Sequence, residues 1–112
     1  MKIAFTAKGT DLNAMIDPRF GRTDYIVLLD DNSGTIQSID NRATGNEAHG
    51  AGTATAQKIF DLAPDILITG NGPGDHAARA LEHSQIRIFI NAHNLTLGEA
   101  FASLKEGKLT EL

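Results

Sequence analysis

The sequence predicts a single α/β domain, in which a mixed β-sheet carries helices on both faces. Three observations predict this class. Short apolar, β-rich segments separated by turn signals fill the first 40 residues. From residue 50 onward, apolar residues recur at helical spacing. Between the helical stretches lie continuous apolar runs, which are typical of parallel strands buried on both faces.

The composition bounds the protein before any motif is considered. A chain of 112 residues is large enough for one core but too small for two, so residues 1–112 are expected to form a single domain. Its apolar content of 41% and charged content of 21% are close to those of soluble globular proteins. A net charge of −4 argues against broad nucleic-acid binding, which usually needs a basic face.

The absence of cysteine and of long apolar runs excludes further classes. Without cysteine there are no disulfides, thiolate nucleophiles or cysteine-held iron–sulfur clusters. No apolar run approaches the roughly 20 residues that span a bilayer, and Met1-Lys2 leads directly into a predicted strand. No membrane association is therefore expected, and the expected location is cytoplasmic.

The first half of the chain predicts a β-meander. Strands are expected at residues 2–7, 25–30 and 35–40, and Asp31-Asn32-Ser33-Gly34 is a hairpin turn signal. Residues 8–23 form a long irregular loop, in which a proline resists helix formation. Loops of this length inside a compact domain are usually functional.

The second half predicts alternating helices and strands. The expected elements are a helix at 50–62, a strand at 66–69, a helix from Pro73 or Gly74 to Ser84, a strand at 86–90, and a helix from a cap at Asn94 or Thr96 to Lys105. Gly107 ends the last helix, and residues 108–112 are expected to be a short tail.

The resulting order, βββαβαβα, predicts a topology and a binding edge. Right-handed crossovers give a five-stranded mixed sheet of order 3-2-1-4-5 with the second strand antiparallel. The gap between the first and fourth strands is then a topological switch point, where open α/β sheets bind ligands. The loops that contain residues 17–22, 41–52 and 70–75 should all lie at that edge.

The unit Arg19-Phe20-Gly21-Arg22 is the first candidate at this edge. Its two guanidinium groups suit phosphate, carboxylate or sulfide-rich anions. In the alternative interpretation, Phe20 fills the core and the arginines are ordinary surface charge.

His49 is the sharpest single candidate, with Gly50 and Gly52 beside it. Glycine lets a backbone approach a ligand closely, and a helix N-terminus offers unpaired N–H groups and partial positive charge. His49 is therefore a candidate metal ligand, although isolated histidines are usually structural. We expect His76 on a helix surface, with an approach to the same pocket as the alternative, and His93 as an outer participant.

The turn at Gly70-Asn71-Gly72-Pro73-Gly74 resembles a phosphate-binding loop. It lacks the lysine and the serine or threonine of a Walker loop and the spacing of a dinucleotide fingerprint. Backbone amides near Asn71, Gly72 and Gly74 are candidates for anion binding. A glycine turn that simply lets strand and helix pack tightly is the alternative.

Catalysis has little support in the sequence. There is no Ser-His-Asp pattern and no nucleophile elbow. Nucleases of the ribonuclease H type need carboxylates that hold divalent metals, usually starting on the first strand, and residues 2–7 contain none. We therefore expect a protein that is not an enzyme.

Taken together, these motifs resemble the dinitrogenase iron–molybdenum cofactor-binding family. The resemblance covers nearly the whole chain, including residues 17–22, His49-Gly50-Ala51-Gly52, Gly70 to Gly74 and Leu97-Gly98-Glu99-Ala100. It implies a ribonuclease H-like three-layer α/β/α fold without nuclease activity. Family members include carriers of nitrogenase cofactor precursors and small stand-alone proteins. One of these stand-alone proteins, the orange protein of sulfate reducers, holds a mixed molybdenum–copper sulfide cluster without covalent attachment. The resemblance matches His49 to the family's histidine before a glycine pair, and Arg19 and Arg22 to its basic loop.

The sequence departs from some cofactor carriers, because it has no cysteine and we expect it to form no extra domain. This difference favours a pocket that holds an anionic cluster by charge, N–H groups and one imidazole. We therefore expect non-enzymatic binding or carriage of a molybdenum-containing metal–sulfur cluster, of iron–molybdenum cofactor-like or molybdenum–copper sulfide type, with a partner protein delivering or receiving it. The alternatives are a regulatory module that binds a nucleotide or small anion, and a protein-interaction adaptor.

Overall fold

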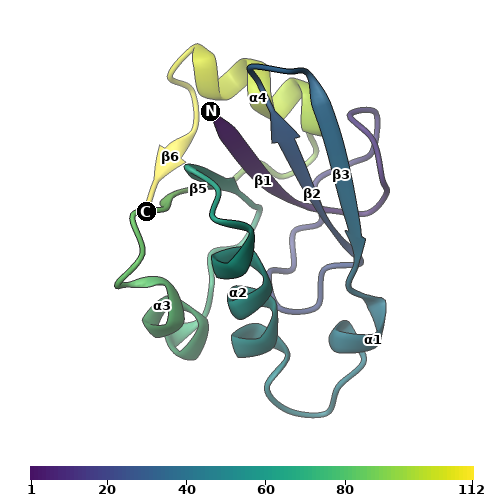
Figure 1. Cartoon of the computed structure of the whole chain (residues 1–112), viewed down its shortest axis with the longest axis vertical. Helices are drawn as coiled ribbons and strands as arrows, with labels where there is room; N and C mark the ends of the chain where they lie inside the picture. Colours follow the sequence, from purple (N-terminus) through teal and green to yellow (C-terminus); the bar gives the residue numbers. More distant parts are fainter.

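Six strands and four helices build a layered α/β fold in the computed structural model, which describes residues 1–112 (Figure 1). In chain order the elements are β1 Lys2–Ala7, β2 Tyr25–Asp30, β3 Thr35–Asp40, α1 Arg42–Gly45, α2 Ala51–Leu62, β4 Ile66–Ile68, α3 Asp75–Leu81, β5 Arg87–Ile90, α4 Leu97–Lys105 and β6 Thr110–Glu111.

The sheet confirms the predicted strand order and extends it by one strand. Its order is β3-β2-β1-β4-β5-β6. β1 pairs in parallel with β4, and β4 with β5, whereas β2 runs antiparallel to both of its neighbours. The expectation of five strands and a C-terminal tail is wrong, because β6 adds antiparallel to β5. Two residues are too few for a periodicity signal; β6 is held by long-range contacts, among them an ion pair of Arg87 with Glu111 at 2.8 Å.

Two other expectations about elements need correction. The stretch after β3 was expected to be loop, but four residues of it form α1, so the observed order is βββααβαβαβ. The helix expected to reach Ser84 ends at Leu81, where the Ser84 side chain donates a hydrogen bond to the Leu81 carbonyl at 2.6 Å. That contact ends the helix in a turn, which helical spacing of apolar residues does not reveal.

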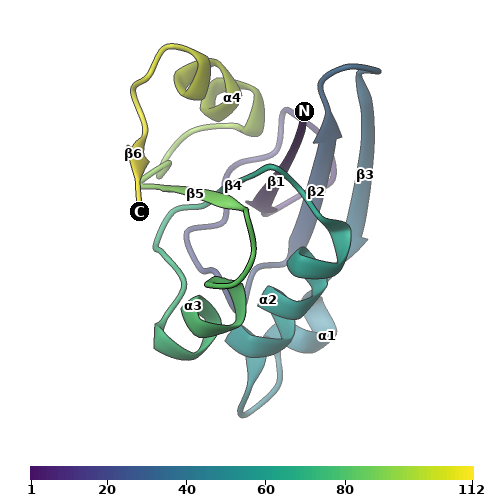
Figure 2. The same ribbon diagram turned by 60° about the vertical axis from the view of Figure 1, so that its left-hand side comes forward.

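Helices cover both faces of the sheet, as predicted. Along β1, alternate residues point to opposite faces: Phe5 packs in a core with Leu97 and Ala100 of α4, whereas Ala4 packs with residues of α2 and α3. Figures 1 and 2 show α4 on one side of the sheet and α2 and α3 together on the other. The chain is therefore a three-layer α/β/α sandwich with one buried apolar cluster on each face of the sheet, where a single core was expected.

Helix α4 begins with a complete capping box. The Thr96 hydroxyl accepts from the backbone N–H of Glu99, and the Glu99 carboxylate accepts from the N–H of Thr96. Thr96, one of the two predicted caps, is therefore the N-cap. These bonds satisfy two of the N–H groups that any helix start leaves free.

No helix in the structure has both the length and the apolar character needed to cross a membrane.

Candidate functional site

The three unusual loops meet at the carboxyl edge of β1 and β4, as the topology predicts. The backbone N–H of Asn71 donates to the Pro18 carbonyl at 2.8 Å. The first turn of α2 lies against the loop after β1, since a Cβ atom on Gly21 would be 2.7 Å from the nitrogen and Cα of Gly52. The loops at 17–22, 41–52 and 70–75 therefore form one continuous surface.

A buried carboxylate organises the arginine loop. Asp17 is fully buried, and its oxygens accept from the backbone N–H and guanidinium of Arg19 at 3.0 to 3.1 Å, and from the N–H of Asp24 at 3.1 Å. Burial by itself would raise the pKa of Asp17, but the hydrogen bonds from Arg19 and Asp24 outweigh it and hold that pKa below its usual range. Asp17 raises the pKa of Arg19 in turn. Arg19 is thus committed to an internal ion pair.

Arg22 has different partners. It is exposed, and its Nη1 donates to the carbonyl oxygens of Gly45 at 2.6 Å and Glu47 at 3.0 Å. No carboxylate lies within ion-pair distance of it, whereas Arg19 contacts both Asp17 and Asp24. Of the two predicted arginines, Arg22 is the one whose positive charge is not neutralised by a carboxylate.

Phe20 lies in the core. Its ring is only 5% exposed and packs with Ile26, Leu28 and Ile59 beneath α2. The Phe20 side chain is therefore buried beneath the loop and anchors Arg19 and Arg22, its neighbours in that loop, to the core.

A hollow of about 460 Å³ lies where α2 and α3 begin. Its lining consists of Gly50, Gly52, Thr53, Gly74, Asp75, His76 and Ala77. The two helices approach closely here: a Cβ atom added to Gly52 would be 3.6 Å from the Cβ of Ala77, which is van der Waals contact. His76 is exposed on the surface of α3, as expected, and it also lines this hollow together with Asp75, which was the alternative. Sequence spacing left the two open, because the packing angle of two helices decides between them.

Both helix starts at the hollow lack side-chain caps, in contrast to α4. The first helical hydrogen bonds are made by the N–H groups of Ala54 and Ala78, so the amides at 51–53 and 75–77 have no partner within the chain. An added Cβ on Gly50 or Gly74 would meet no atom within 4 Å. Donors and open backbone therefore line the same space, an arrangement that favours an anionic guest.

The other predicted site residues do not line this hollow. His49 is exposed and immediately precedes Gly50, the first residue of the lining. Asn71 and Gly72 are outside the lining: the Asn71 side-chain oxygen is 3.0 Å from the Nε2 of His93, and a Cβ on Gly72 would be 3.4 Å from Ile90. The structure thus brings Gly50, Gly52 and Gly74 together, with His49 at the margin.

The protein alone does not assemble a closed metal site. No group of three or more histidine, aspartate or glutamate side chains lies close enough to hold a metal ion.

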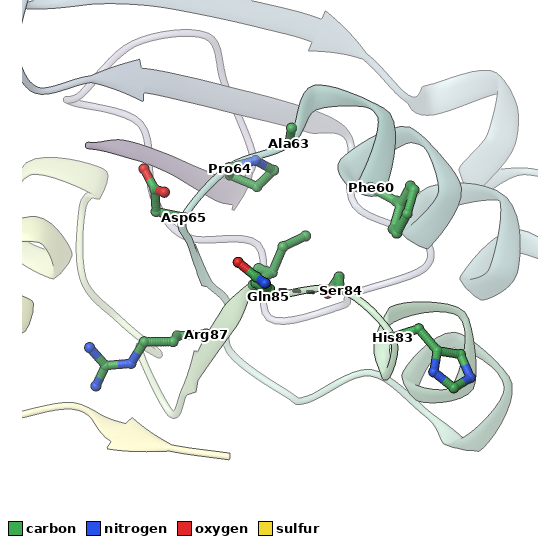
Figure 3. A pocket seen from close by; sticks show the side chains of 9 residues that line it. Phe60, Ala63, Pro64, Asp65, His83, Ser84, Gln85 and Arg87 are labelled. Carbon is green, nitrogen blue, oxygen red and sulfur yellow. Dashed lines mark hydrogen bonds between the residues drawn. The ribbon is translucent and has the colours of Figure 1, made fainter.

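A second hollow, of about 520 Å³, lies at the opposite edge of the sheet (Figure 3). Its walls come from the ends of α2 and α3 and the segments entering β4 and β5, including Phe60, Pro64 and Ile86. Arg87, at its rim, is already paired with Glu111. This hollow is larger, but it contains neither free helix N–H groups nor any of the predicted site residues, so the smaller hollow is the candidate site.

A polar network that the sequence did not reveal anchors the loop between β3 and α2. The fully buried Asn41 donates to the Thr23 carbonyl at 3.1 Å and to the Thr55 hydroxyl at 3.0 Å. Its side-chain oxygen accepts from Lys58 at 2.8 Å, and Thr55 donates to the Gly21 carbonyl at 2.8 Å. The network fixes α2 relative to the arginine loop.

Known proteins share the sequence pattern and the fold of this chain. The family model for the dinitrogenase iron-molybdenum cofactor matches residues 1–107. The chain belongs to this family. No curated protein matches it.

Two solved structures resemble the family member described here. The apo form of the orange protein from Desulfovibrio gigas is 32% identical, with a TM-score of 0.91 over 99% of this chain and 92% of that one. A NifB-like protein of the DUF35 family from Thermotoga is 28% identical, with a TM-score of 0.83 over 99% of this chain and 92% of that one. The resemblance inferred from the motifs is confirmed, and family and neighbours together indicate a cofactor-binding or carrier role.

Proposed function

We propose that this protein binds and carries an anionic, molybdenum-containing metal–sulfur cluster in the hollow between the starts of α2 and α3. The observation that carries the proposal is the pair of uncapped helix starts with unbonded N–H groups, which lie beside a glycine-lined space of about 460 Å³. The family match to the dinitrogenase iron-molybdenum cofactor and the likeness to the orange protein support a cluster as the guest. Carriage rather than catalysis fits the absence of any nucleophile–base pattern.

The residues fit such a guest in size, charge and chemistry. Gly50, Gly52 and Gly74 leave their backbones open, so sulfide or oxo ligands can approach the N–H groups. Arg22 supplies a positive charge that no carboxylate neutralises. His49, exposed next to Gly50, is the proposed metal ligand, and one imidazole is enough when the guest brings its other ligands.

The remaining predicted residues take supporting roles in this proposal. Arg19 holds the arginine loop through Asp17, and Phe20 anchors it in the core. Gly21 lets the loop touch α2, and Asn71 and Gly72 shape the turn that leads to Gly74. A non-covalent guest held in this way can be released to a partner protein, and we propose a cytoplasmic location for the exchange.

Anaerobic reconstitution tests the proposal. Purified protein is mixed with tetrathiomolybdate and copper(I), and separately with iron and sulfide, and passed through a desalting column. We expect a visible charge-transfer band that travels with the protein, together with amide NMR shifts at residues 50–53 and 74–77. Protein that elutes without a band and with unchanged shifts in both regions would refute cluster binding.

Matched histidine variants sharpen this test. His49→Ala should lower the metal retained per protein and alter the band. His83→Ala removes an exposed imidazole that lies beyond the end of α3 and lines the other hollow. It should change neither, since the His83 side chain is 89% exposed and is paired with Glu82. Equal retention by the two variants would remove His49 from the proposed ligands.

Nucleotide titration separates the regulatory alternative from the cluster. A nucleotide-binding module should show saturable shifts at residues 70–75 on addition of ATP or GTP and leave His49 unperturbed. Such a response, without retention of metal, would favour the anion-binding module over the carrier.

A further inference from the structure

The loop that carries His49 is attached to the body of the protein by very few hydrogen bonds. We call residues 46–50 the histidine loop; it hangs as the lowest segment in Figures 1 and 2. All five residues are exposed. Their own backbone bonds are local: from the N–H of Asn46 to Arg42, from the N–H of Glu47 to Thr44, and from the N–H of Ala54, in the first turn of α2, to Gly50. Nothing in the core therefore fixes the position of this loop.

Arg22 makes the hydrogen bonds that tie this region to the rest of the fold. Its Nη1 reaches the carbonyl oxygens of Gly45 and Glu47 from the opposite loop, and no other side chain hydrogen-bonds to residues 45–50. The two backbones also touch here, since a Cβ atom on Gly45 would lie 3.1 Å from the Arg22 carbonyl oxygen. The guanidinium therefore acts as a clasp at the base of the histidine loop.

The partners in this clasp are neutral. Arg19 and Arg42 each pair with an aspartate at 3.0 Å and 2.7 Å, but Arg22 binds only carbonyl oxygens. The ionised guanidinium makes charge-assisted hydrogen bonds to either kind of acceptor, but an anion adds the attraction between opposite charges and can accept two of its N–H groups at once. An anion within reach of Arg22 therefore competes favourably with the carbonyls of Gly45 and Glu47.

The hollow adjoins the loop that carries Arg22. Gly21, the residue next to Arg22, is in contact with Gly52, which lines the hollow. Gly50 joins the histidine loop to α2 with φ at +79°, and its surroundings are open. Since glycine accepts large backbone changes, Gly50 can act as the hinge when the clasp is released.

We propose that Arg22 is an exchangeable clasp: it holds the histidine loop in the empty protein and transfers its hydrogen bonds to the anionic guest, which frees the loop to bring His49 over the hollow. This inference rests on the proposed function and adds a conformational step to it. The same exchange in reverse would return the loop when the guest leaves for a partner.

NMR of the carbonyl carbons of Gly45 and Glu47 tests the exchange directly. In the free protein, Arg22→Ala should shift both carbonyl signals upfield and speed amide exchange at Asn46 and Glu47 by about tenfold, the loss expected for a hydrogen-bonded anchor. Arg42→Ala, which removes an exposed arginine paired with Asp40, should leave the carbonyl signals of Gly45 and Glu47 in place. Unchanged carbonyl signals in Arg22→Ala would show that there is no clasp.

Titration of the wild-type protein with tetrathiomolybdate and copper(I) supplies the second arm. We expect the Gly45 and Glu47 carbonyl signals to move toward their positions in Arg22→Ala as the visible band appears. A band with unmoved carbonyl signals would overturn the clasp while leaving cluster binding intact. Absence of both band and amide shifts would refute the proposed function and the clasp with it. Arg22→Lys, which keeps the positive charge, should retain more metal than Arg22→Ala. Equal retention by the two variants would overturn the contact between the charge at position 22 and the guest.

Discussion

Gly21 lies so close to the backbone of Gly52 that there is no room for a side chain on Gly21. A Cβ atom on Gly21 would be 2.7 Å from the nitrogen and the Cα of Gly52. The atoms that this Cβ would meet belong to the backbone, so no side-chain rotation can relieve the clash. The contact joins the arginine loop to the start of α2 and sets the position of the candidate site.

Gly21→Ala should therefore destabilise the fold. We expect a loss of about 2 to 3 kcal/mol in the free energy of unfolding, typical of overpacking against backbone. Urea unfolding followed by far-UV circular dichroism measures it. Gly98→Ala is the control. Gly98 lies in α4, where alanine is favoured over glycine by up to about 1 kcal/mol, and its added Cβ would be 3.5 Å from the nearest atom, the Leu12 carbonyl oxygen. Equal stability of Gly21→Ala and wild type would contradict the close approach.

Asp17 should make stability depend on pH in the acid range. Its pKa in the folded protein is below the unfolded value of about 3.9, so the stability it contributes is present above that value and is lost as pH falls through the folded pKa. Asp17→Asn should cost about 2 to 3 kcal/mol at neutral pH, since charged hydrogen bonds to Arg19 and Asp24 are weakened.

Unfolding curves recorded at pH values from 7 down to 2 check this expectation. The difference between wild type and Asp17→Asn should shrink steadily below pH 4. Asp40→Asn is the comparison: the pKa of Asp40 is also lowered, to about 2, by hydrogen bonds from Arg42, but this pair is exposed and should hardly change the unfolding midpoint at neutral pH. A difference for Asp17→Asn that does not vary with pH would argue against an ionised buried carboxylate.

Asn41→Ala should loosen the connection between α2 and the arginine loop. The change removes two donated hydrogen bonds, leaves the Thr23 carbonyl buried without its partner, and takes an acceptor from Lys58. We expect a loss of about 2 to 3 kcal/mol. Asn32→Ala, in the exposed β2–β3 turn, is the matched control, because the Asn32 side chain makes no hydrogen bond. Comparable melting temperatures for the two variants would show that the network contributes little.

Thr96→Ala should weaken the start of α4. Loss of an N-cap side chain typically costs about 1 kcal/mol, and here the capping box with Glu99 is also broken. Thermal unfolding measures the loss, and Thr10→Ala, at an exposed position without side-chain hydrogen bonds, provides the reference. A wild-type midpoint for Thr96→Ala would mean that packing of Leu97 and Ala100 alone determines this helix.

Local sequence signals predicted the elements that are long or strongly patterned. The bounds of β1, β2 and β3 agree with the residues predicted for them, because each is an apolar or β-rich run that ends at a turn signal. α1 and β6 were missed, since four and two residues carry no readable period and depend on contacts with distant residues. The pairing of Arg87 with Glu111 is one such contact.

By itself, the sequence determined the fold class, the strand order of the first five strands, and the edge at which the three loops meet. These follow from hydrophobic period, turn chemistry and the handedness of crossovers, which are local or topological properties. Only the tertiary structure decided the roles of the residues at that edge. There Asp17 neutralises Arg19, whereas Arg22 binds carbonyl oxygens. Phe20 is buried, and His76 lines the hollow. Such assignments depend on which side chains come within about 3 Å across the fold, and pairing at that range is not encoded in residue type or spacing.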